Sequence, residues 1–439
     1  MTADKTGKAD NPDKAGNMDL AIESGKSSNE VSKPSKSDNA IEPKKLDDAS
    51  EPGEPSEPKK SDKAVNPKKS NQAEDSAAKE EKPLRHGYTT GSCATAATQA
   101  ALTALILQES QLHATIRIPI GEIVTFEIVR CEYEAERAEA EIIKDGGDDP
   151  DATHKARIIS EVSWRSEPGI ELDGGVGVGR VTKPGLPVPV GEAAINPVPR
   201  KMIRQAAEAV LNQYGLDRGV RVVISVPDGE EIAKKTLNAR LGILGGISIL
   251  GTRGTVVPFS TSAYKASVAQ AIRVAVTCGC SHLVLSTGGR TEKYGMDMYP
   301  DLSEEAFVEM GDFIGFALQQ ARRQGIRKVT LVGMMGKFSK VAQGVMMVHS
   351  KSAPIDFGFL GQVATEAGAS QEQADAILSA NTAALVGDWM QEWGYSDFFE
   401  LLCTYCCDAG LREVGGGMEI ETVIISMKAN LLGSARIEG

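Results

Sequence analysis

The chain has 439 residues, of which 41% are hydrophobic and 25% are charged, and its formal net charge is -12. This balance is typical of a soluble globular protein of about two domains, and the acidity argues against a nucleic-acid partner, because such binders present a basic surface. No apolar run reaches the roughly 18 to 20 residues that a membrane span needs, so the sequence predicts a cytoplasmic protein with no membrane contact.

Residues 1–80 are nearly all Lys, Asp, Glu, Ser, Pro, Asn and Ala. Such a segment buries too little apolar surface to offset the entropy lost on ordering. We therefore expect a disordered, charged, low-complexity tail ahead of the folded part.

Residues 84–200 are expected to form an α+β domain. Thr89, Thr90 and Ser92 are possible N-caps of an alanine-rich helix over 93–108. Segments 115–120 and 123–129 alternate apolar and polar residues around a glycine, which predicts a hairpin, and 138–143 and 157–164 are further expected strands. A Gly- and Pro-rich stretch over 173–203 is interpreted as an ordered loop that joins two domains.

Residues 201–439 are expected to form an α/β domain with a mostly parallel sheet. Apolar strands are predicted at 221–226, 282–287 and 328–332, with helical patterns between them. Helices within 371–408 and a strand at 420–425 complete the domain. Ligands of such sheets bind beyond the carboxyl ends of the strands, where glycine turns follow these segments.

Three glycine turns are candidates for a ligand site. The densest is LGILGGISILGTRG, from Leu241, and the others follow the strands at 282–287 and 328–332. Glycine allows close approach of the backbone to a ligand, but it also serves plain turns. The pair Gly336-Lys337 does not complete a phosphate loop, because Leu331 and Phe338 stand where that motif needs Gly and Ser or Thr.

Charged groups add two further features. Asp228 directly follows a strand, where a carboxylate can serve as a helix cap, a general base or a cation ligand. For the acidic turn at 145–151 we expect a structural or hydrogen-bonding role. Lys and Arg residues recur around the Gly- and Pro-rich loop, among them Arg180, Lys183 and Arg200. They are solvated surface or contacts for a polycarboxylate ligand.

The seven cysteines are expected to be reduced thiols, since their number is odd and no secretory signal precedes them. Cys278 and Cys280 with His282, and the group Cys403, Cys406 and Cys407, each lack a second pair at zinc-site spacing. Buried structural thiols, and no metal site, are therefore expected.

Several long segments taken together resemble the cobalt-precorrin-5B (C1)-methyltransferase family of the anaerobic cobalamin pathway. They run in order from about residue 84 to the C-terminus: RHGYTTGSCATAA, KDGGDDPDATH, GVGRVTKPGLPVPVGEAAINPVPRKMI, VPDGEEIAKKTLNARLGILGGISILGTRG and GMMGKFSKVAQGVMMVHSK. The resemblance implies methyl transfer from S-adenosylmethionine to C-1 of cobalt-precorrin-5B, which gives cobalt-precorrin-6A. Cobalt then enters only as part of the polycarboxylate corrin substrate.

Turn position and side-chain chemistry place the sites that this reaction needs. We expect Gly245, Gly246, Gly251, Thr287, Gly288, Gly289 and Gly333 to line the S-adenosylmethionine site. Thr89, Thr90, Ser92, Arg180, Lys183 and Arg200 are expected to hold substrate carboxylates, and Asp228 is the candidate base if one is needed.

Three alternatives stay open from the sequence. The chain could be a non-catalytic corrinoid-binding carrier protein, an α/β enzyme with another coenzyme, or an interaction protein that acts through its tail. A homo-oligomer and transient contact with neighbouring pathway enzymes are equally open.

Overall fold

The structure is a computed structural model that describes residues 83–439, so the tail predicted for residues 1–80 lies outside the described residues. Within that described part, one helix, Thr90–Leu107 (α1), is long and apolar enough by length and composition to cross a membrane, and 78% of it is buried inside the protein. Burial of this kind is what the core helix of a globular fold shows.

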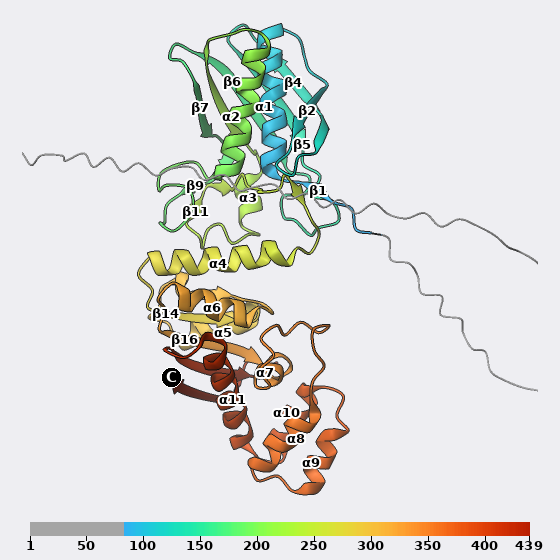
Figure 1. Cartoon of the computed structure of the whole chain (residues 1–439), viewed down its shortest axis with the longest axis vertical. Helices are drawn as coiled ribbons and strands as arrows, with labels where there is room; N and C mark the ends of the chain where they lie inside the picture. The colour runs from blue at the N-terminus through green and yellow to red at the C-terminus, as the bar shows by residue number, and fades with distance from the viewer. Residues whose placement is uncertain (1–82) are drawn as a thin grey trace, which may run out of the picture. The chain divides into compact units, whose positions relative to one another are not determined.

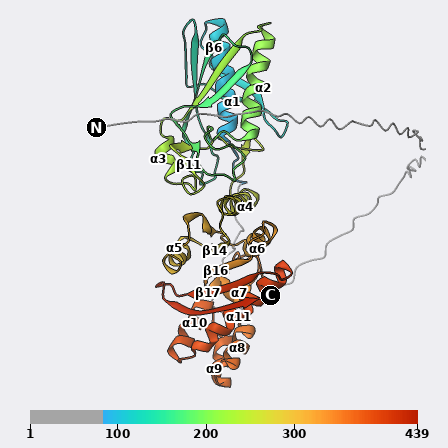
Figure 2. The same ribbon diagram turned by 90° about the vertical axis from the view of Figure 1, so that its left-hand side faces the viewer.

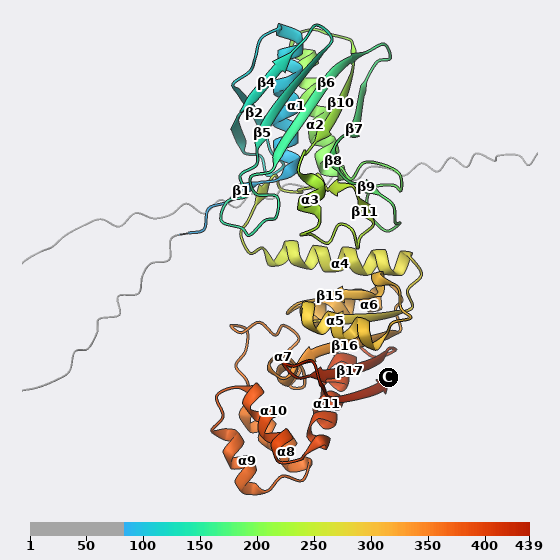
Figure 3. The same cartoon turned by 180° about the vertical axis from the view of Figure 1, so that it is seen from behind.

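The first sheet has five strands in the order β4-β5-β6-β10-β7. The strands β4 (Arg130–Tyr133), β5 (Arg137–Ile143), β6 (Arg157–Arg165) and β10 (Gly219–Ser225) pair antiparallel, whereas β7 (Ile170–Gly174) runs parallel to β10. Helices α1 and α2 (Pro197–Gln213) cover one face, as the opposite views of Figures 1 and 3 show. The α+β character expected here is confirmed.

The sequence explains this packing. Six alanines of α1, among them Ala97 and Ala101, are fully or almost fully buried, so the helix can lie close to both α2 and the sheet. The hairpin of β2 (His113–Arg117) and β3 (Ile123–Glu127) forms at the predicted place. The uncovered face of the sheet carries ion pairs, in which Glu141 binds both Arg130 and Arg157.

One predicted strand belongs to a different sheet. Segment 221–226 was assigned to the parallel sheet of the second domain, but β10 pairs with β6 and β7 of the first sheet. The expected boundary at residues 200 and 201 consequently falls inside α2, which packs against α1. The apolar run of β10 is buried between its two neighbouring strands, and this burial explains why it resembles a parallel strand.

Short paired strands follow the first sheet. Gly246–Ile247 (β12) pairs with Gly177–Val178 (β8), and Ile243–Leu244 (β11) pairs with Arg180–Val181 (β9). The helix α3 (Gly229–Ala233) lies beside β12, and Thr255–Val256 (β13) pairs with Gly87–Tyr88 (β1). These pairs turn the predicted Gly- and Pro-rich loop into ordered backbone.

The second sheet has the order β15-β14-β16-β17-β18. Its first four strands are parallel, and β18 is antiparallel to β17. Their bounds are β14 (His282–Ser286), β15 (Phe307–Glu309), β16 (Lys328–Met334), β17 (Glu419–Ile425) and β18 (Leu431–Glu438). A mostly parallel sheet was predicted and is confirmed.

Helices lie on both faces of this sheet. Figure 2 shows α5 (Gly289–Met298) and α6 (Ile314–Arg323) on opposite sides of β14 and β16. The alternation of strand side chains agrees, because Leu283 and Leu285 pack with α6 whereas Val284 packs with residues on the α5 side. The sheet is therefore doubly wound.

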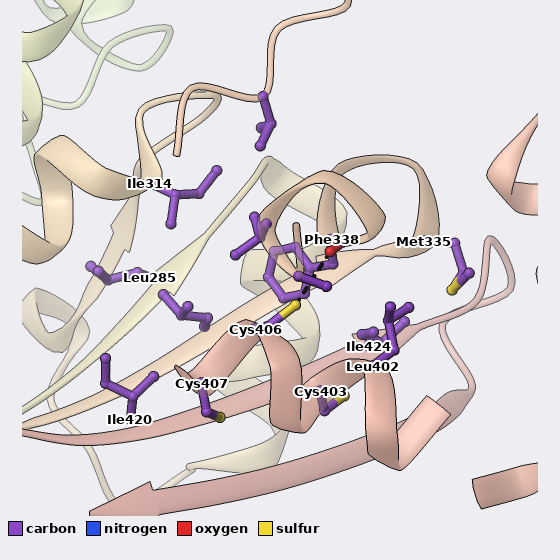
Figure 4. Close-up of a cluster of buried hydrophobic side chains, with 14 of the residues drawn as sticks. Leu285, Ile314, Met335, Phe338, Leu402, Cys403, Cys406, Cys407, Ile420 and Ile424 are labelled. Carbon is purple, nitrogen blue, oxygen red and sulfur yellow. Dashed lines mark hydrogen bonds between the residues drawn. The ribbon is translucent and has the colours of Figure 1, made fainter. Parts of the chain in front are cut away.

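The larger core lies between the second sheet and the helices α4 (Thr261–Thr277), α6 and α11 (Ser396–Val414), with α7 (Met335–Val341) close by. Figure 4 shows Cys403, Cys406 and Cys407 of α11 in this core, with Cys406 beside Phe338. Burial raises the pKa of all three thiols, and Cys406 donates to the backbone oxygen of Phe338 at 3.3 Å. They are buried thiols, as expected. The same expectation is wrong for Cys278, which is exposed after the end of α4. Helices α8 (Phe357–Glu366), α9 (Gln371–Leu378) and α10 (Ala383–Glu392) complete this half.

Candidate cofactor and substrate sites

The strand order of the second sheet defines one position for a ligand. The chain leaves β14 for β15 on one side and returns to β16 on the other, so the connections diverge at the carboxyl ends of β14 and β16. Diverging connections leave a crevice at this point, which is where doubly wound sheets bind ligands.

A cavity of about 930 Å³ lies at this edge. The turns after β14, β16 and β17 and one face of α10 form its walls. The lining residues are Thr287, Gly288, Gly289, Arg290, Thr291, Met334, Met335, Gly336, Lys337, Ala384, Gly387, Asp388, Gln391, Ile425, Ser426, Met427, Lys428, Asn430 and Leu432. Its size is that of a site for a nucleoside-sized molecule.

Two side chains fix the turn after β14. The hydroxyl of Thr291 accepts from the backbone N–H of Thr287 at 3.1 Å and donates to the backbone oxygen of Gly288 at 2.7 Å. Lys337 donates to the backbone oxygen of Thr287 at 3.0 Å and pairs with Asp312 at 3.1 Å. The turn is thus held from inside the protein, independently of a ligand.

Helix α5 begins at this turn and directs its first N–H groups toward the cavity edge. Gly288 is the N-cap, and the first bond back to it comes from the N–H of Glu292. The N–H groups of the preceding positions have no acceptor within the helix, and the helix dipole adds positive potential there. A Cβ added at Gly288 or Gly289 would meet nothing within 4 Å, so both glycines border open space.

The other glycines predicted to contact the cofactor do not line this cavity. Gly246 packs on β8, where an added Cβ would lie 2.1 Å from the backbone oxygen of Gly177, and at Gly251 it would lie 2.4 Å from Thr89. Gly245 lies in the same segment, with φ +81°. Gly333 is buried in β16, and its missing side chain makes room for the ring of Phe338. Packing explains Gly246, Gly251 and Gly333.

Thr89, Thr90 and Ser92, predicted to hold substrate carboxylates, are instead buried at the start of α1. Thr89 is the N-cap, and its hydroxyl accepts from the N–H of Ser92 at 3.2 Å. Thr90 accepts from the N–H of Leu250 at 2.9 Å, and Ser92 donates to the backbone oxygen of Gly254 at 2.8 Å. These hydroxyls tie α1 to the segment after β12.

The three predicted basic residues have different surroundings. Arg180 is half-exposed and pairs with Asp173 at 3.0 Å. Lys183 pairs with Glu305 at 2.5 Å, and this contact lowers the pKa of that carboxyl group. Arg200 donates to the backbone oxygens of Ile195 and Ala193 at 2.7 and 3.0 Å.

Arg200 also lines a second, smaller cavity of about 440 Å³ beside the start of α2. Three prolines form a stiff wall, and three basic side chains follow one another along the helix. The lining residues are Pro187, Val188, Pro189, Glu192, Pro197, Arg200, Lys201, Arg204, Gln205 and Glu208. Lys201 and Arg204 are exposed, so this hollow offers accessible positive charge for carboxylates.

Asp228 and the acidic turn lie apart from both cavities. Asp228 precedes α3, is exposed, and makes no capping hydrogen bond. In the acidic turn, Asp148 and Asp149 accept from backbone N–H groups at 2.6 and 2.9 Å. The hydrogen-bonding role favoured for that turn is confirmed, and the structure gives Asp228 no contact that marks it as a base.

Sequence reasoning missed the walls supplied by α10 and by the turn between β17 and β18. Asp388 of α10 is the important omission, because it is the sole carboxylate among the described residues that line the larger cavity. The amphipathic pattern of α10 predicts a helix, but no sequence signal shows which neighbour its exposed face meets.

Fold and cavities together define a two-sheet α/β protein with a cavity at the switch point of a doubly wound sheet. The sequence profile of the CbiD family matches residues 77–258, and that of the CbiD C-terminal domain matches residues 347–436. The chain belongs to the CbiD family.

Several relatives align with it over nearly their whole length. The cobalt-precorrin-5B C(1)-methyltransferase of Geobacillus kaustophilus (strain HTA426) is 67% identical, with 82% of this chain and 97% of the relative covered. The protein of that name from Priestia megaterium is 64% identical, with 81% and 97% covered. A crystal structure of a cobalamin biosynthesis protein (cbiD) from Archaeoglobus fulgidus is 30% identical, covers 58% of this chain and 78% of its own, and has a TM-score of 0.32.

Proposed function

We propose that this protein transfers a methyl group from S-adenosylmethionine to C-1 of cobalt-precorrin-5B, giving cobalt-precorrin-6A, in anaerobic cobalamin biosynthesis. The observation that carries this proposal is the 64–67% identity to proteins named for this C-1 methylation, over nearly all of their length. These names favour an enzyme over the non-catalytic corrinoid carrier. We place the reaction in the cytoplasm, the compartment that the sequence predicts.

The larger cavity is our proposed site for S-adenosylmethionine. The free N–H groups at the start of α5 suit the carboxylate of its methionine part. Asp388, on the wall that α10 forms, suits the ribose hydroxyls, because carboxylates accept hydrogen bonds from such groups. The side chains of Met334, Met335 and Ile425 give the apolar surroundings that a sulfonium methyl group needs.

The chemistry requires positioning more than reactive side chains. The bond between sulfur and methyl breaks with its electron pair left on sulfur, while the ring carbon supplies the pair for the new C–C bond. The products are the methylated corrin and S-adenosylhomocysteine. Alignment of donor and acceptor and exclusion of water supply most of the rate gain in such a displacement, and no covalent nucleophile is needed.

Substrate carboxylates require basic groups, and the smaller cavity supplies them. We propose that Arg200, Lys201 and Arg204 bind acetate or propionate side chains of the corrin, whose cobalt is carried in with the substrate. We keep Arg180 of β9, which is half-exposed and paired with Asp173, as a further proposed substrate contact.

Calorimetry with S-adenosylmethionine in the absence of corrin tests the proposal. The protein should bind the cofactor alone, and Gly289→Val should abolish binding without unfolding the chain, because a side chain there meets only open space. A protein that binds corrin but no S-adenosylmethionine would be a carrier. Normal cofactor binding by Gly289→Val would show that the site lies elsewhere.

A further inference from the structure

Two cations from the segment around β9 and β11 lie among glutamates at the β14–β15 edge of the second sheet. Lys183 follows β9, and Arg240 precedes β11, the strand that pairs with β9. Lys183 binds Glu305 and donates to the backbone oxygen of Arg240 at 3.2 Å. Lys183 therefore holds the backbone of Arg240 in place.

The guanidinium group of Arg240 makes the central contact. Its two terminal nitrogens bind the two carboxylate oxygens of Glu292, one of them at 3.2 Å. Nε lies 3.8 Å from Glu304, and a terminal nitrogen lies 3.5 Å from the backbone oxygen of Phe307. The side chains of Arg240 and Glu292 are only 20% and 12% exposed, so water screens this pair weakly.

Glu292 connects this contact to the cofactor turn. It lies in the first turn of α5, and its N–H donates to the backbone oxygen of Gly288 at 3.0 Å. A two-pronged Arg–carboxylate pair fixes direction as well as distance. The pair therefore restrains the helical turn whose free N–H groups border the larger cavity.

We infer that Arg240 is a positioning residue for the methyl-donor site: by gripping Glu292 it holds the start of α5 in the orientation that binds S-adenosylmethionine. Arg240 does not line the cavity, so it acts through α5 and not by touching the cofactor. The inference rests on the proposed function, because it takes the larger cavity as the donor site.

The surroundings show why arginine is needed here. Glu309, at the end of β15, has a pKa raised first by burial and then by the neighbouring Glu292. Removing the charge of Arg240 would leave Glu292 and Glu304 near this third carboxyl group with less compensation. A lysine would restore the charge but only one contact to Glu292.

The test compares cofactor affinity in four variants of the full chain: Arg240→Met, Arg240→Lys, Glu292→Gln and Arg436→Met. Arg436→Met is the matched control, because it also removes an arginine that pairs with two glutamates of the second sheet. Arg436 lies on β18 and pairs at 3.3 Å with Glu419 and with Glu421 of β17. S-adenosylmethionine binding is measured by calorimetry on folded protein, with thermal unfolding and steady-state kinetics alongside.

Arg240→Met and Glu292→Gln should weaken S-adenosylmethionine binding roughly tenfold, a common size for coupling between neighbouring sites. Arg240→Lys should recover part of the affinity. KM for the cofactor should rise, with kcat at saturation changed by less than about twofold. Arg436→Met should lower the melting temperature but leave affinity unchanged, because it lies at the other edge.

Wild-type affinity in both Arg240→Met and Glu292→Gln would overturn the inference, as would an equal loss in Arg436→Met. Should Arg240→Met not fold, the isosteric Glu292→Gln and the charge-preserving Arg240→Lys decide the question. Gly289→Val separates this from the proposed function: if it also binds normally, the donor site itself is misplaced, whereas if it alone fails to bind, only the role of Arg240 is wrong.

Discussion

Asp388 is the side chain for which we make the most specific prediction at the proposed S-adenosylmethionine site. It is exposed on α10, lines the larger cavity, and has no hydrogen-bonding or ion-pairing partner among the described residues. A carboxylate that faces a cavity without an internal partner is free to bind a ligand.

Replacing this carboxylate should weaken S-adenosylmethionine binding without affecting the fold. A hydrogen bond to a charged group contributes about 1.5 kcal/mol, so Asp388→Ala should raise the Kd roughly tenfold by calorimetry. Glu392→Ala is the control, because Glu392 is an exposed carboxylate on the same helix outside the cavity. Equal affinities in both variants would remove Asp388 from the site.

His282 provides a second expectation at this scale, for stability against pH. Its ring is buried, and Nε2 forms a hydrogen bond of 2.8 Å with the hydroxyl of Thr330. Burial lowers the pKa of His282 from 6.5 to about 4. Between these values the unfolded chain takes up a proton that the folded chain does not, so the free energy of unfolding falls as the pH drops from 6.5 to 4.

His282→Gln should remove most of this change, which in the native protein amounts to on the order of 3 kcal/mol between pH 6.5 and pH 4. Urea unfolding at pH values from 4 to 7 measures it. His113→Gln is the matched control, because His113 is exposed on β2 and should leave the slope unchanged. An unaltered slope in His282→Gln would assign the pH dependence to other groups, such as the nearby Glu421.

Two glycines near the β16–α7 junction have different surroundings. Gly333 packs against the protein core, whereas Gly336 lines the larger cavity. An alanine Cβ at Gly333 would lie 2.2 Å from the ring of Phe338, whereas at Gly336 it would meet nothing within 4 Å. Gly333→Ala should therefore reduce the free energy of unfolding by about 1 to 3 kcal/mol, as overpacking of a core does.

Gly336→Ala should leave stability nearly unchanged, and denaturant unfolding of the two variants side by side makes the comparison. A destabilised Gly336→Ala with a stable Gly333→Ala would contradict the packing that places Phe338 behind β16. Gly333 was predicted to contact the cofactor because it lies at the end of a strand. A glycine needed for packing and a glycine that contacts a ligand can both occupy this position, so the sequence does not separate the two roles.

The hydrophobic periodicity of the sequence predicted most strands and helices, but it did not predict which strands pair with one another. The runs that became β2, β3, β5, β6, β14, β16 and β17 all appear near their expected places. Segment 221–226 was assigned to the wrong sheet because the sequence of an apolar strand does not show which strand it pairs with. Its partner β6 lies far earlier in the chain. The hydroxyls of Thr89, Thr90 and Ser92 look like ligand groups, but they satisfy backbone atoms at the start of α1.

At the scale of the whole molecule, the proposed function requires the cofactor cavity and the basic surface to act on one substrate. Thr287, Gly288 and Gly289 could be placed at the cavity from the sequence, because turns after parallel strands share one edge. Asp388 and Arg240 could not, since their positions depend on how α10 and the β9–β11 segment pack in three dimensions. Long-range packing is thus what completes the site.

The most direct measurement is turnover of cobalt-precorrin-5B with methyl-labelled S-adenosylmethionine, followed by mass spectrometry of the corrin and assay of the spent cofactor. The account predicts one labelled methyl group on the corrin at C-1 and an equal amount of S-adenosylhomocysteine. Recovery of bound but unlabelled corrin, with the cofactor unchanged, would contradict it.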